Sequence, residues 1–452
     1  MSGSVGSADV SFSVGADAVP VSCGSLYEET ATAGPVTGAV GQDIEVGTLV
    51  TGGGITGLSA GLYLATAGES VAVVDAGAPG WGASGRNGGQ VNPGLKMPPS
   101  GVESHLAPEA GRRLAVAAWN APDLVFALIE KHGIRCDAVR GGTVRAATAG
   151  SQVPALDRLT EECLARGGDV AWLNRGEMAE LTGTDRYCAG MIDRRGGQVN
   201  PLSYTRGLAS AAIGRGAQVY SGTRIMSLTR DGGTWLAMTD SGYAIRCRNV
   251  VLATNGYTNG LWPGLSDSIV PVYSAIIATE PLPERLRAAI LARREVLYEL
   301  GEITVYYRVD EAGRLLIGRR SVSRPLVGAE AFPELRHLAH RLWPGLAGTG
   351  WTHGWNGQLA VTTDHYPHWH EPAPGVIACL GYNGRGVAMA TLLGREVARR
   401  IQGVPAGELL LPPTRIRGIP LHRFWKAGVA ARVALGRWRD RRQEGRAAGG
   451  EG

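Results

Sequence analysis

Residues 46–75 contain the pattern that most constrains what this chain can fold into. A short apolar run at 46–50 leads into Gly52-Gly53-Gly54-Ile55-Thr56-Gly57, and an alanine- and leucine-rich stretch follows to Gly68. A second apolar run at 71–74 ends in Asp75. The order strand, glycine-rich turn, helix, strand predicts a unit of parallel sheet.

The glycine spacing in this unit matches G-x-G-x-x-G, which in this context predicts a dinucleotide site. Gly52 permits a tight turn, Gly54 lets the backbone approach a pyrophosphate, and Gly57 lets the helix pack on the strand. The helix start would offer free N–H groups to the phosphates, and Asp75 would accept hydrogen bonds from ribose hydroxyls. The contacts predicted from this unit are Gly52, Gly54, Ile55, Thr56, Gly57, Asp75 and Ala76. The pattern alone does not separate FAD from NAD.

Composition excludes several classes of protein. The chain has 452 residues, enough for two or three domains, and its 67 glycines have no three-residue period, which excludes collagen. A net charge of +5 is too dilute to predict a nucleic-acid partner, and no apolar run is long enough to predict a transmembrane segment. The six cysteines are at least 25 residues apart, which argues against a redox or zinc pair. With no secretory signal, they predict reduced thiols and a cytoplasmic location.

The rest of the chain predicts two interleaved domains. Helical patterns, including one at 111–132, lie between 101 and 187, and strand-like runs alternate with a helix between 204 and 253. An alternating pair of runs at 303–309 and 315–318 predicts an antiparallel hairpin. We therefore predict an α/β fold in which a Rossmann-like, parallel-sheet domain is interleaved with an α+β substrate domain containing an antiparallel sheet.

The predicted boundaries divide the chain into four parts. They are a flexible N-terminal tail (1–23), a discontinuous dinucleotide-binding domain (24–98, 188–262 and 346–410), a substrate domain (99–187 and 263–345) and a basic C-terminal extension (411–452). The extension is amphipathic between 415 and 446. It predicts either a helix packed on the body with a solvated face or peripheral contact with a membrane surface.

A second glycine-rich segment, at 80–90, suggests which cofactor is bound. Its small residues would let the backbone run against a large flat ligand. Its sequence Gly-Ala-Ser-Gly-Arg-Asn-Gly-Gly resembles a segment of the D-amino-acid-oxidase-like flavoproteins, specifically of their gamma-glutamylputrescine-oxidase-like branch. Residues 26–31, 251–257, 355–368 and 381–387 fit the same resemblance. Amides at 381–387 would also stabilise negative charge on a reduced flavin.

The resemblance implies FAD, bound noncovalently because 355–358 contains no cysteine where some relatives attach the flavin. The further cofactor contacts that it implies are Gly82, Ala83, Ser84, Arg86, Asn87, Gly88, Gly89, Gln90, Val199, Thr254, Asn255, Gly256, Tyr257, Trp355, Gly357, Gly381, Asn383, Gly384, Arg385, Gly386 and Val387.

The resemblance also implies an activity. A primary or secondary amine or amino acid, with a gamma-glutamylated or carboxylate-bearing amine as first choice, would give a hydride to flavin N5. The imine would hydrolyse to an aldehyde or keto acid, and O2 would reoxidise the flavin to yield H2O2. Strand 270–274 has no lysine, the residue that some relatives use to activate oxygen, so a dehydrogenase with a quinone or protein acceptor stays open. A flavin-binding subunit without turnover is a third hypothesis.

Candidate substrate contacts come from the hairpin and from two aromatic residues. Tyr306 and Arg308 share one face of the predicted strand, and Arg308 would either clamp a substrate carboxylate or make a surface salt bridge. Trp355 and Tyr382 would either line an aromatic cage for an alkylamine or pack in the core. His365, His368 and His370 have a spacing that could suit a metal, but Pro367 would interrupt a helix that aligned them. We predict no metal site.

Overall fold

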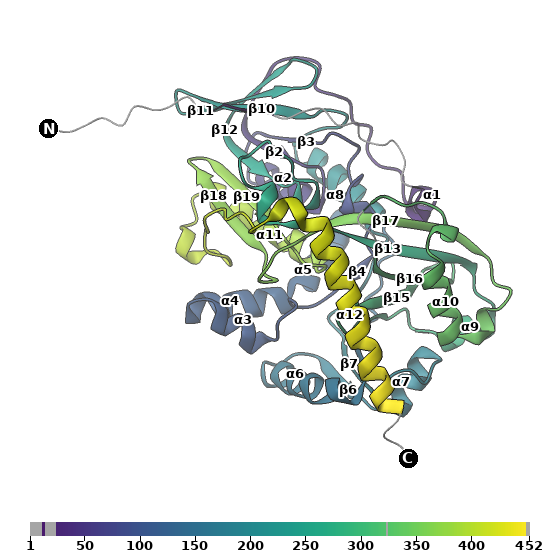
Figure 1. Ribbon diagram of the computed structural model, residues 1–452. Coiled ribbons are helices and arrows are strands. Elements are labelled where there is room, and N and C mark those ends of the chain that lie inside the picture. Colours follow the sequence, from purple (N-terminus) through teal and green to yellow (C-terminus); the bar gives the residue numbers. More distant parts are fainter. Residues whose placement is uncertain (1–10, 14–23, 322–323, 449–452) are drawn as a thin grey trace.

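Two large sheets organise the computed structural model, which describes residues 11–13, 24–321 and 324–448 (Figure 1). Nine described strands form the first sheet and eight form the second. A two-stranded ribbon, β4 (Gln90–Val91) with β8 (Gly197–Gln198), stands apart from both. The predicted combination of a parallel sheet and an antiparallel sheet in an α/β fold is confirmed.

The first sheet has a parallel centre. Here β2 pairs with β3 and β12, β3 pairs with β9, and the end of β12 pairs with β19, all in parallel. Thr51, Val74, Leu252 and Ala378 lie side by side in this register, so the carboxyl ends of four strands meet at one edge. The strands are β1 (Ser11–Ser13), β2 (Ile44–Thr51), β3 (Val71–Val74), β9 (Gln218–Tyr220), β10 (Ile225–Asp231), β11 (Thr234–Thr239), β12 (Ala244–Leu252), β18 (His368–Ala373) and β19 (Val376–Leu380).

Helices from distant parts of the chain cover this sheet. The helix α2 (Ile55–Thr66) packs against α8 (Pro201–Gly214) and α11 (Gly386–Ile401), and its small residues make the contact close. A Cβ on Gly394 of α11 would come within 2.6 Å of the carbonyl oxygen of Thr56 in α2, so only glycine fits there. The glycine turn that begins α2 is thus held against the helix that follows the last glycine loop.

The second sheet is mostly antiparallel. Its order is β17-β13-β16-β15-β14-β5-β7-β6, with one parallel pair between β14 and β5. The expected hairpin is present as β15 and β16. The strands are β5 (Thr143–Ala147), β6 (Val170–Leu173), β7 (Ala189–Asp193), β13 (Val270–Pro281), β14 (Val296–Leu300), β15 (Val305–Val309), β16 (Arg314–Arg320) and β17 (Trp351–Val361). The helices α7 (Arg175–Thr182), α9 (Glu284–Ala289) and α10 (Pro333–Leu342) lie at the outer side of this half (Figure 1).

The sheets and the core place four segments differently from the expected boundaries. Strands β7 and β17 belong to the second sheet, although 188–262 and 346–410 were assigned to the dinucleotide-binding domain. Conversely, α4 (Pro108–Trp119) and α5 (Ala121–His132) pack on α11 and share its core, although 99–187 was assigned to the substrate domain. Ser11–Ser13 pairs with β10, so this part of the expected tail is a strand; the other tail residues lie outside the described chain.

The single helical pattern expected at 111–132 is two helices. The break falls at Asn120, whose ψ of 3° departs from helical geometry. Pro122 stands in the first turn of α5, and a proline disfavours continuous helix through the residues before it. The remaining helices are α1 (Leu26–Thr30), α3 (Pro99–His105) and α6 (Val153–Ala165).

The C-terminal helix α12 (Trp425–Ala448) runs along the outside of the molecule toward α7 (Figure 1). It contacts the body through an ion pair of Arg432 with Glu302 at 3.0 Å and through Gly436, which lies against Ile303. Leu421 and Phe424 before it are 73% and 54% exposed. No helix within the described ranges is both long and apolar enough to cross a membrane.

Candidate functional site

One cavity of about 650 Å³ opens at the edge where the parallel strands end. It extends from the glycine turn after β2 to the face of the second sheet, where Tyr298 of β14 and Tyr306 of β15 line it. Ligands of doubly wound sheets bind at this edge, and the volume lies within the usual range for cofactor pockets, about 300–1,000 Å³. The cavity is therefore the candidate active site.

The first glycine turn has the geometry that its sequence predicts. Gly52 has a φ of +113°, which other residues rarely adopt, and a Cβ on Gly57 would overlap the carbonyl oxygen of Gly52. Gly54 lines the cavity and caps α2 with extended backbone. Its missing side chain leaves the start of α2 open to the cavity.

Asp75 lies at the end of β3, in the wall of the cavity. One carboxylate oxygen accepts a hydrogen bond from Gly53 N at 2.6 Å and the other accepts one from Gly77 N at 2.7 Å. Burial raises the pKa of Asp75, and these two backbone bonds oppose the rise. Each oxygen keeps a second lone pair that could accept a ribose hydroxyl.

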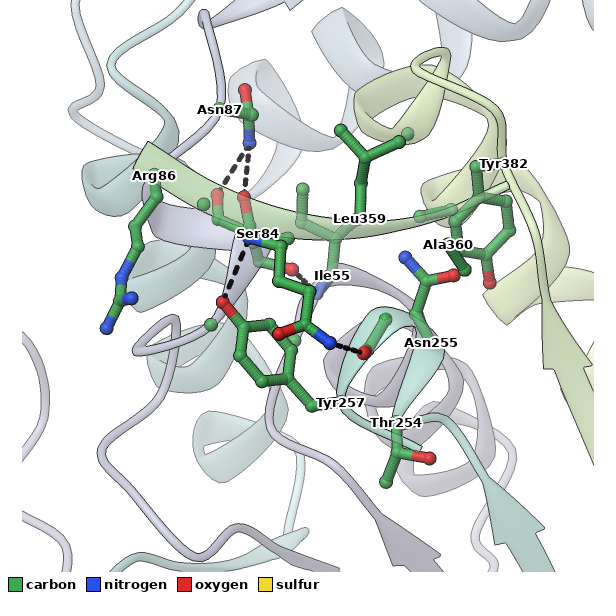
Figure 2. Close-up of a pocket in the computed structure, with 18 of the residues that line it drawn as sticks. Ile55, Ser84, Arg86, Asn87, Thr254, Asn255, Tyr257, Leu359, Ala360 and Tyr382 are labelled. Carbon is green, nitrogen blue, oxygen red and sulfur yellow. Dashed lines mark hydrogen bonds between the residues drawn. The ribbon is translucent and has the colours of Figure 1, made fainter. Parts of the chain in front are cut away.

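The loop at 80–90 is tied to this turn. Ser84 Oγ accepts a hydrogen bond from Ile55 N at 3.0 Å, which gives the first amide of α2 a partner. Asn87 donates to the carbonyl oxygens of Ala83 and Ser84 (Figure 2). Its own oxygen accepts a hydrogen bond from Gly89 N. The asparagine thus stabilises the loop through hydrogen bonds to the loop's own backbone.

The second glycine-rich turn, at 381–386, faces the same cavity. Asn255 Oδ1 accepts a hydrogen bond from Gly381 N at 3.0 Å, which joins this turn to the segment after β12. The hydroxyls of Tyr382 and Thr56 lie 2.5 Å apart, so the last glycine turn also contacts the first. Burial raises the pKa of Tyr382. Two turns more than 300 residues apart in sequence therefore enclose one space.

Most of the residues predicted from the sequence meet in this cavity. The predicted residues that line it are Gly52, Gly54, Ile55, Thr56, Asp75, Ala76, Gly82, Ala83, Ser84, Arg86, Asn87, Gly88, Gln90, Thr254, Asn255, Gly256, Tyr257, Tyr306, Gly357, Tyr382, Asn383, Gly384, Arg385, Gly386 and Val387. Gly57, Gly89, Val199, Gly381, Trp355 and Arg308 stand behind this lining.

Arg308 does not occupy the position expected of a carboxylate clamp. It is only 2% exposed, and its guanidinium donates to Gly88 O at 2.8 Å, Gln198 Oε1 at 2.6 Å and Tyr27 Oη at 3.1 Å. Neither a substrate carboxylate nor a surface salt bridge fits this environment. Arg308 instead stabilises the loop at 80–90 through its hydrogen bond to Gly88 O.

Trp355 also belongs to the core, one of its two expected roles. Its side chain is fully buried, its indole N–H donates to Arg86 O at 2.9 Å, and it packs edge-on against Tyr27. Tyr382 is buried as well, but it does line the cavity. The aromatic wall at the second sheet comes from Tyr273, Tyr298 and Tyr306.

Sequence reasoning missed several lining residues. The lining residues that were not predicted include Tyr273, Tyr298, Lys96, Arg320 and Gln358. Lys96 carried a usable signal, because it is one of only three lysines in a chain with 45 basic residues. Its position on a loop after β4 gave no indication of a cavity.

The histidine-rich stretch around β18 has local partners. His368 Nε2 lies 3.1 Å from Asp364, and His370 Nδ1 lies 2.9 Å from the carbonyl oxygen of Thr414. Within the described ranges, no three His, Cys, Asp or Glu side chains form a group that could hold a metal.

Most of the chain matches a known protein family. The sequence profile of the family DAO, FAD dependent oxidoreductase, matches residues 48–400. The chain belongs to the DAO family of FAD-dependent oxidoreductases. This DAO-family chain is 31% identical over 407 residues to a probable oxidoreductase OrdL of Rhizobium meliloti, covering 89% of this chain and 94% of that protein.

A second sequence relative and one solved structure are also similar to this DAO-family chain. It is 27% identical to gamma-glutamylputrescine oxidoreductase of Escherichia coli, covering 84% of this chain and 89% of that one. The structure of glycine oxidase from Geobacillus kaustophilus matches with a TM-score of 0.70 and 24% identity, over 83% of this chain and all of that one. The predicted family and fold are confirmed.

The residues of the cavity fit FAD. The cofactor of the family needs a phosphate-binding turn, a carboxylate at the ribose end and a backbone that passes close to a flat ring. A Cβ on Gly82 would lie 3.1 Å from the ring of Tyr257, and one on Gly88 would lie 2.9 Å from that of Tyr306, so the loop is as narrow as glycine allows. Without side chains at these two positions, the loop packs directly against both tyrosines.

Proposed function

We propose that this protein oxidises the C–N bond of an amine or amino acid that carries a carboxylate, with FAD bound noncovalently in the cavity. One observation supports the proposal above all others. The two glycine turns and an aromatic face of the second sheet border a single cavity, so a nucleotide cofactor and a small substrate would lie end to end. FAD supplies the electron acceptor for the carbon next to nitrogen.

The chain's own residues would prepare the substrate rather than exchange protons with it. Tyr273, Tyr298 and Tyr306 line the cavity on the side of the second sheet. Tyr306 is anchored there, because its hydroxyl lies 2.8 Å from that of Ser274. A dry aromatic wall lowers the pKa of a substrate ammonium, and the neutral amine is the form that gives up a hydride. Water excluded by the wall would also protect the product imine until release.

Noncovalent attachment is supported by the lining itself. Covalent flavins in related enzymes are joined to cysteine or histidine, and the described cavity wall contains neither. The cysteines Cys136, Cys163, Cys247 and Cys379 are buried elsewhere as free thiols. Precipitation of the purified protein with acid should release all of its flavin into the supernatant, whereas flavin retained in the pellet would exclude noncovalent binding.

The test of the activity is anaerobic mixing of the FAD-loaded protein with a panel of amines and the matching alcohols. Loss of the flavin absorbance with amines and not with alcohols is the expected result. Flavin that stays oxidised with every amine would refute turnover and favour a flavin-binding subunit. Protein that retains no FAD would refute the cofactor assignment itself.

Admission of air to the reduced protein identifies the acceptor. Rapid return of the absorbance with formation of H2O2 supports an oxidase. The strand β13 lines the cavity through Val272, Tyr273 and Ser274 and has no lysine there, so the alternative of a dehydrogenase stays open. Slow return in air, with fast return on addition of a soluble quinone, would establish that alternative. A cytoplasmic location stays a prediction from the sequence.

A further inference from the structure

Three of the five cationic residues in the described cavity lining lie close enough to act on one another's charge. They are Lys96 on the loop after β4, Arg320 at the end of β16 and Arg385 in the last glycine turn. Asp75 is the only carboxylate in the described lining, and it is bound to the backbone of the first turn. This part of the cavity is therefore strongly positive.

The strand geometry directs Arg320 toward the cavity. A Cβ on Gly318 would overlap the ring of Tyr306, so Tyr306 lies across Gly318 on the cavity side of β16. Side chains two residues apart on a strand share a face, which puts Arg320 on the same side. Arg319, one residue earlier, lies on the opposite face and pairs with Glu334 at 3.7 Å.

The cations have few partners of their own. Arg385 lies 4.3 Å from the ring centre of Tyr298 and donates to its hydroxyl at 2.6 Å, which leaves most of its N–H groups unused in the described structure. No hydrogen bond or ion pair joins the side chains of Lys96 and Arg320 to any other described residue. Glu302 is the carboxylate whose charge acts on both, and it is already paired with Arg432.

Cations that lie together without matching anions repel one another, and a bound anion would compensate this repulsion. Desolvation by the surrounding protein, together with the charges of Arg320 and Arg385, lowers the pKa of Lys96 to about 8. A carboxylate is small enough for this corner and takes hydrogen bonds from both guanidinium and ammonium groups. Arg385 lies against Tyr298 and Arg320 shares the face of Tyr306, so the cations lie along the tyrosine wall.

We propose that Lys96, Arg320 and Arg385 bind a carboxylate group of the substrate, in the role first expected of Arg308. The inference rests on the proposed function and narrows its substrate class to amines with a carboxylate distant from the oxidised nitrogen. The site would favour such an amine over an uncharged amine of the same length through binding, not through the chemical step.

The test uses the FAD-loaded protein and glutarate, a dicarboxylate that cannot be oxidised. Titration followed by the flavin absorbance should give saturable binding of glutarate and none of glutaramide, its uncharged analogue. Arg320→Gln and Lys96→Met should each raise the Kd for glutarate by tenfold or more. Arg319→Gln is the matched control, because its side chain faces away from the cavity, and it should leave the Kd unchanged.

Substrate kinetics provide the second measurement. The preference for 5-aminopentanoate over pentylamine, as a ratio of kcat/KM, should fall in Arg320→Gln and Lys96→Met and persist in Arg319→Gln. Equal binding of glutarate and glutaramide by the unaltered protein would overturn the inference, as would variants with unchanged Kd. If a variant loses its FAD, the contrast between the two ligands on the unaltered protein still decides. Amines that fail to bleach the flavin at all would instead refute the proposed function.

Discussion

The substitution Gly54→Ala tests whether the backbone at this turn touches the cofactor. Gly54 has a φ of −87°, so alanine adds no backbone strain, and only the space around its Cβ matters. That Cβ would lie 2.7 Å from Ser84 Oγ, closer than an ordinary contact, and would also project toward the pyrophosphate position. The two effects can be separated by a second substitution.

Displacing Ser84 removes its hydrogen bond to Ile55 N, at a cost of about 1 kcal/mol in the free energy of unfolding of the apoprotein. Crowding of the pyrophosphate should cost FAD binding about 1–3 kcal/mol, by analogy with overpacked cores. That range corresponds to a rise of roughly 5- to 150-fold in the Kd for FAD. Ser84→Ala removes the oxygen and leaves its Cβ at a comfortable 3.7 Å from the new methyl.

The assay is a double-mutant cycle on the apoprotein. Denaturant unfolding should show that Gly54→Ala costs little further stability once Ser84 is alanine. Titration with FAD, followed by flavin fluorescence, should show that the raised Kd persists in the double variant. Gly41→Ala, at a position with nothing within 4 Å, is the control. Recovery of FAD affinity in the double variant would refute direct contact of Gly54 with the cofactor.

Three further predictions concern other parts of the chain. Arg308→Met should lower the free energy of unfolding by about 3 kcal/mol, because three groups lose a buried charged partner. It should leave the Kd for glutarate unchanged in FAD-loaded protein. A selective loss of glutarate binding would restore the hypothesis that Arg308 clamps the substrate carboxylate. Glutarate should bind more weakly as the pH rises through about 8, since Lys96 then loses its charge while the guanidinium groups of Arg320 and Arg385 keep theirs. Lys96→Met should flatten this dependence, and an unchanged profile would exclude Lys96. Residues 415–448 contain ten Lys or Arg and two Asp or Glu, so the protein should sediment with vesicles containing anionic lipid and not with neutral vesicles. Phe424→Ser should weaken sedimentation with the anionic vesicles, because Phe424 is exposed. Sedimentation with neither kind of vesicle would leave α12 as a helix that only packs on the body.

Local patterns predicted the cofactor end of the cavity well. The turn at 52–57 needs its glycines for reasons confined to one strand and one helix, so the spacing alone indicated Gly52, Gly54 and Gly57. Asp75 followed from the end of the next strand. These features depend on neighbours within about 30 residues, which a sequence displays directly.

The substrate end depends on how two sheets meet. Alternation correctly put Tyr306 and Arg308 on one face of β15, but it could not show that the loop carrying Gly88 covers Arg308 and leaves Tyr306 at the cavity. The same limit hid Arg320, whose exposure to the cavity depends on the packing of Tyr306 over Gly318. The face of the strand on which a side chain lies follows from local alternation. Whether that side chain is buried or lines the cavity depends on segments far away in the sequence.

The guanidinium of Arg308 joins segments near residues 27, 88, 198 and 308, and the Tyr382–Thr56 contact joins the two ends of the cavity. A chain emerging from the ribosome can form the first turn early, yet its supporting bonds wait for β15 and then for the last glycine loop. Closures over such separations are slow. Newly made protein should therefore acquire its cofactor only when translation is nearly finished, and chains truncated before residue 380 should emerge colourless.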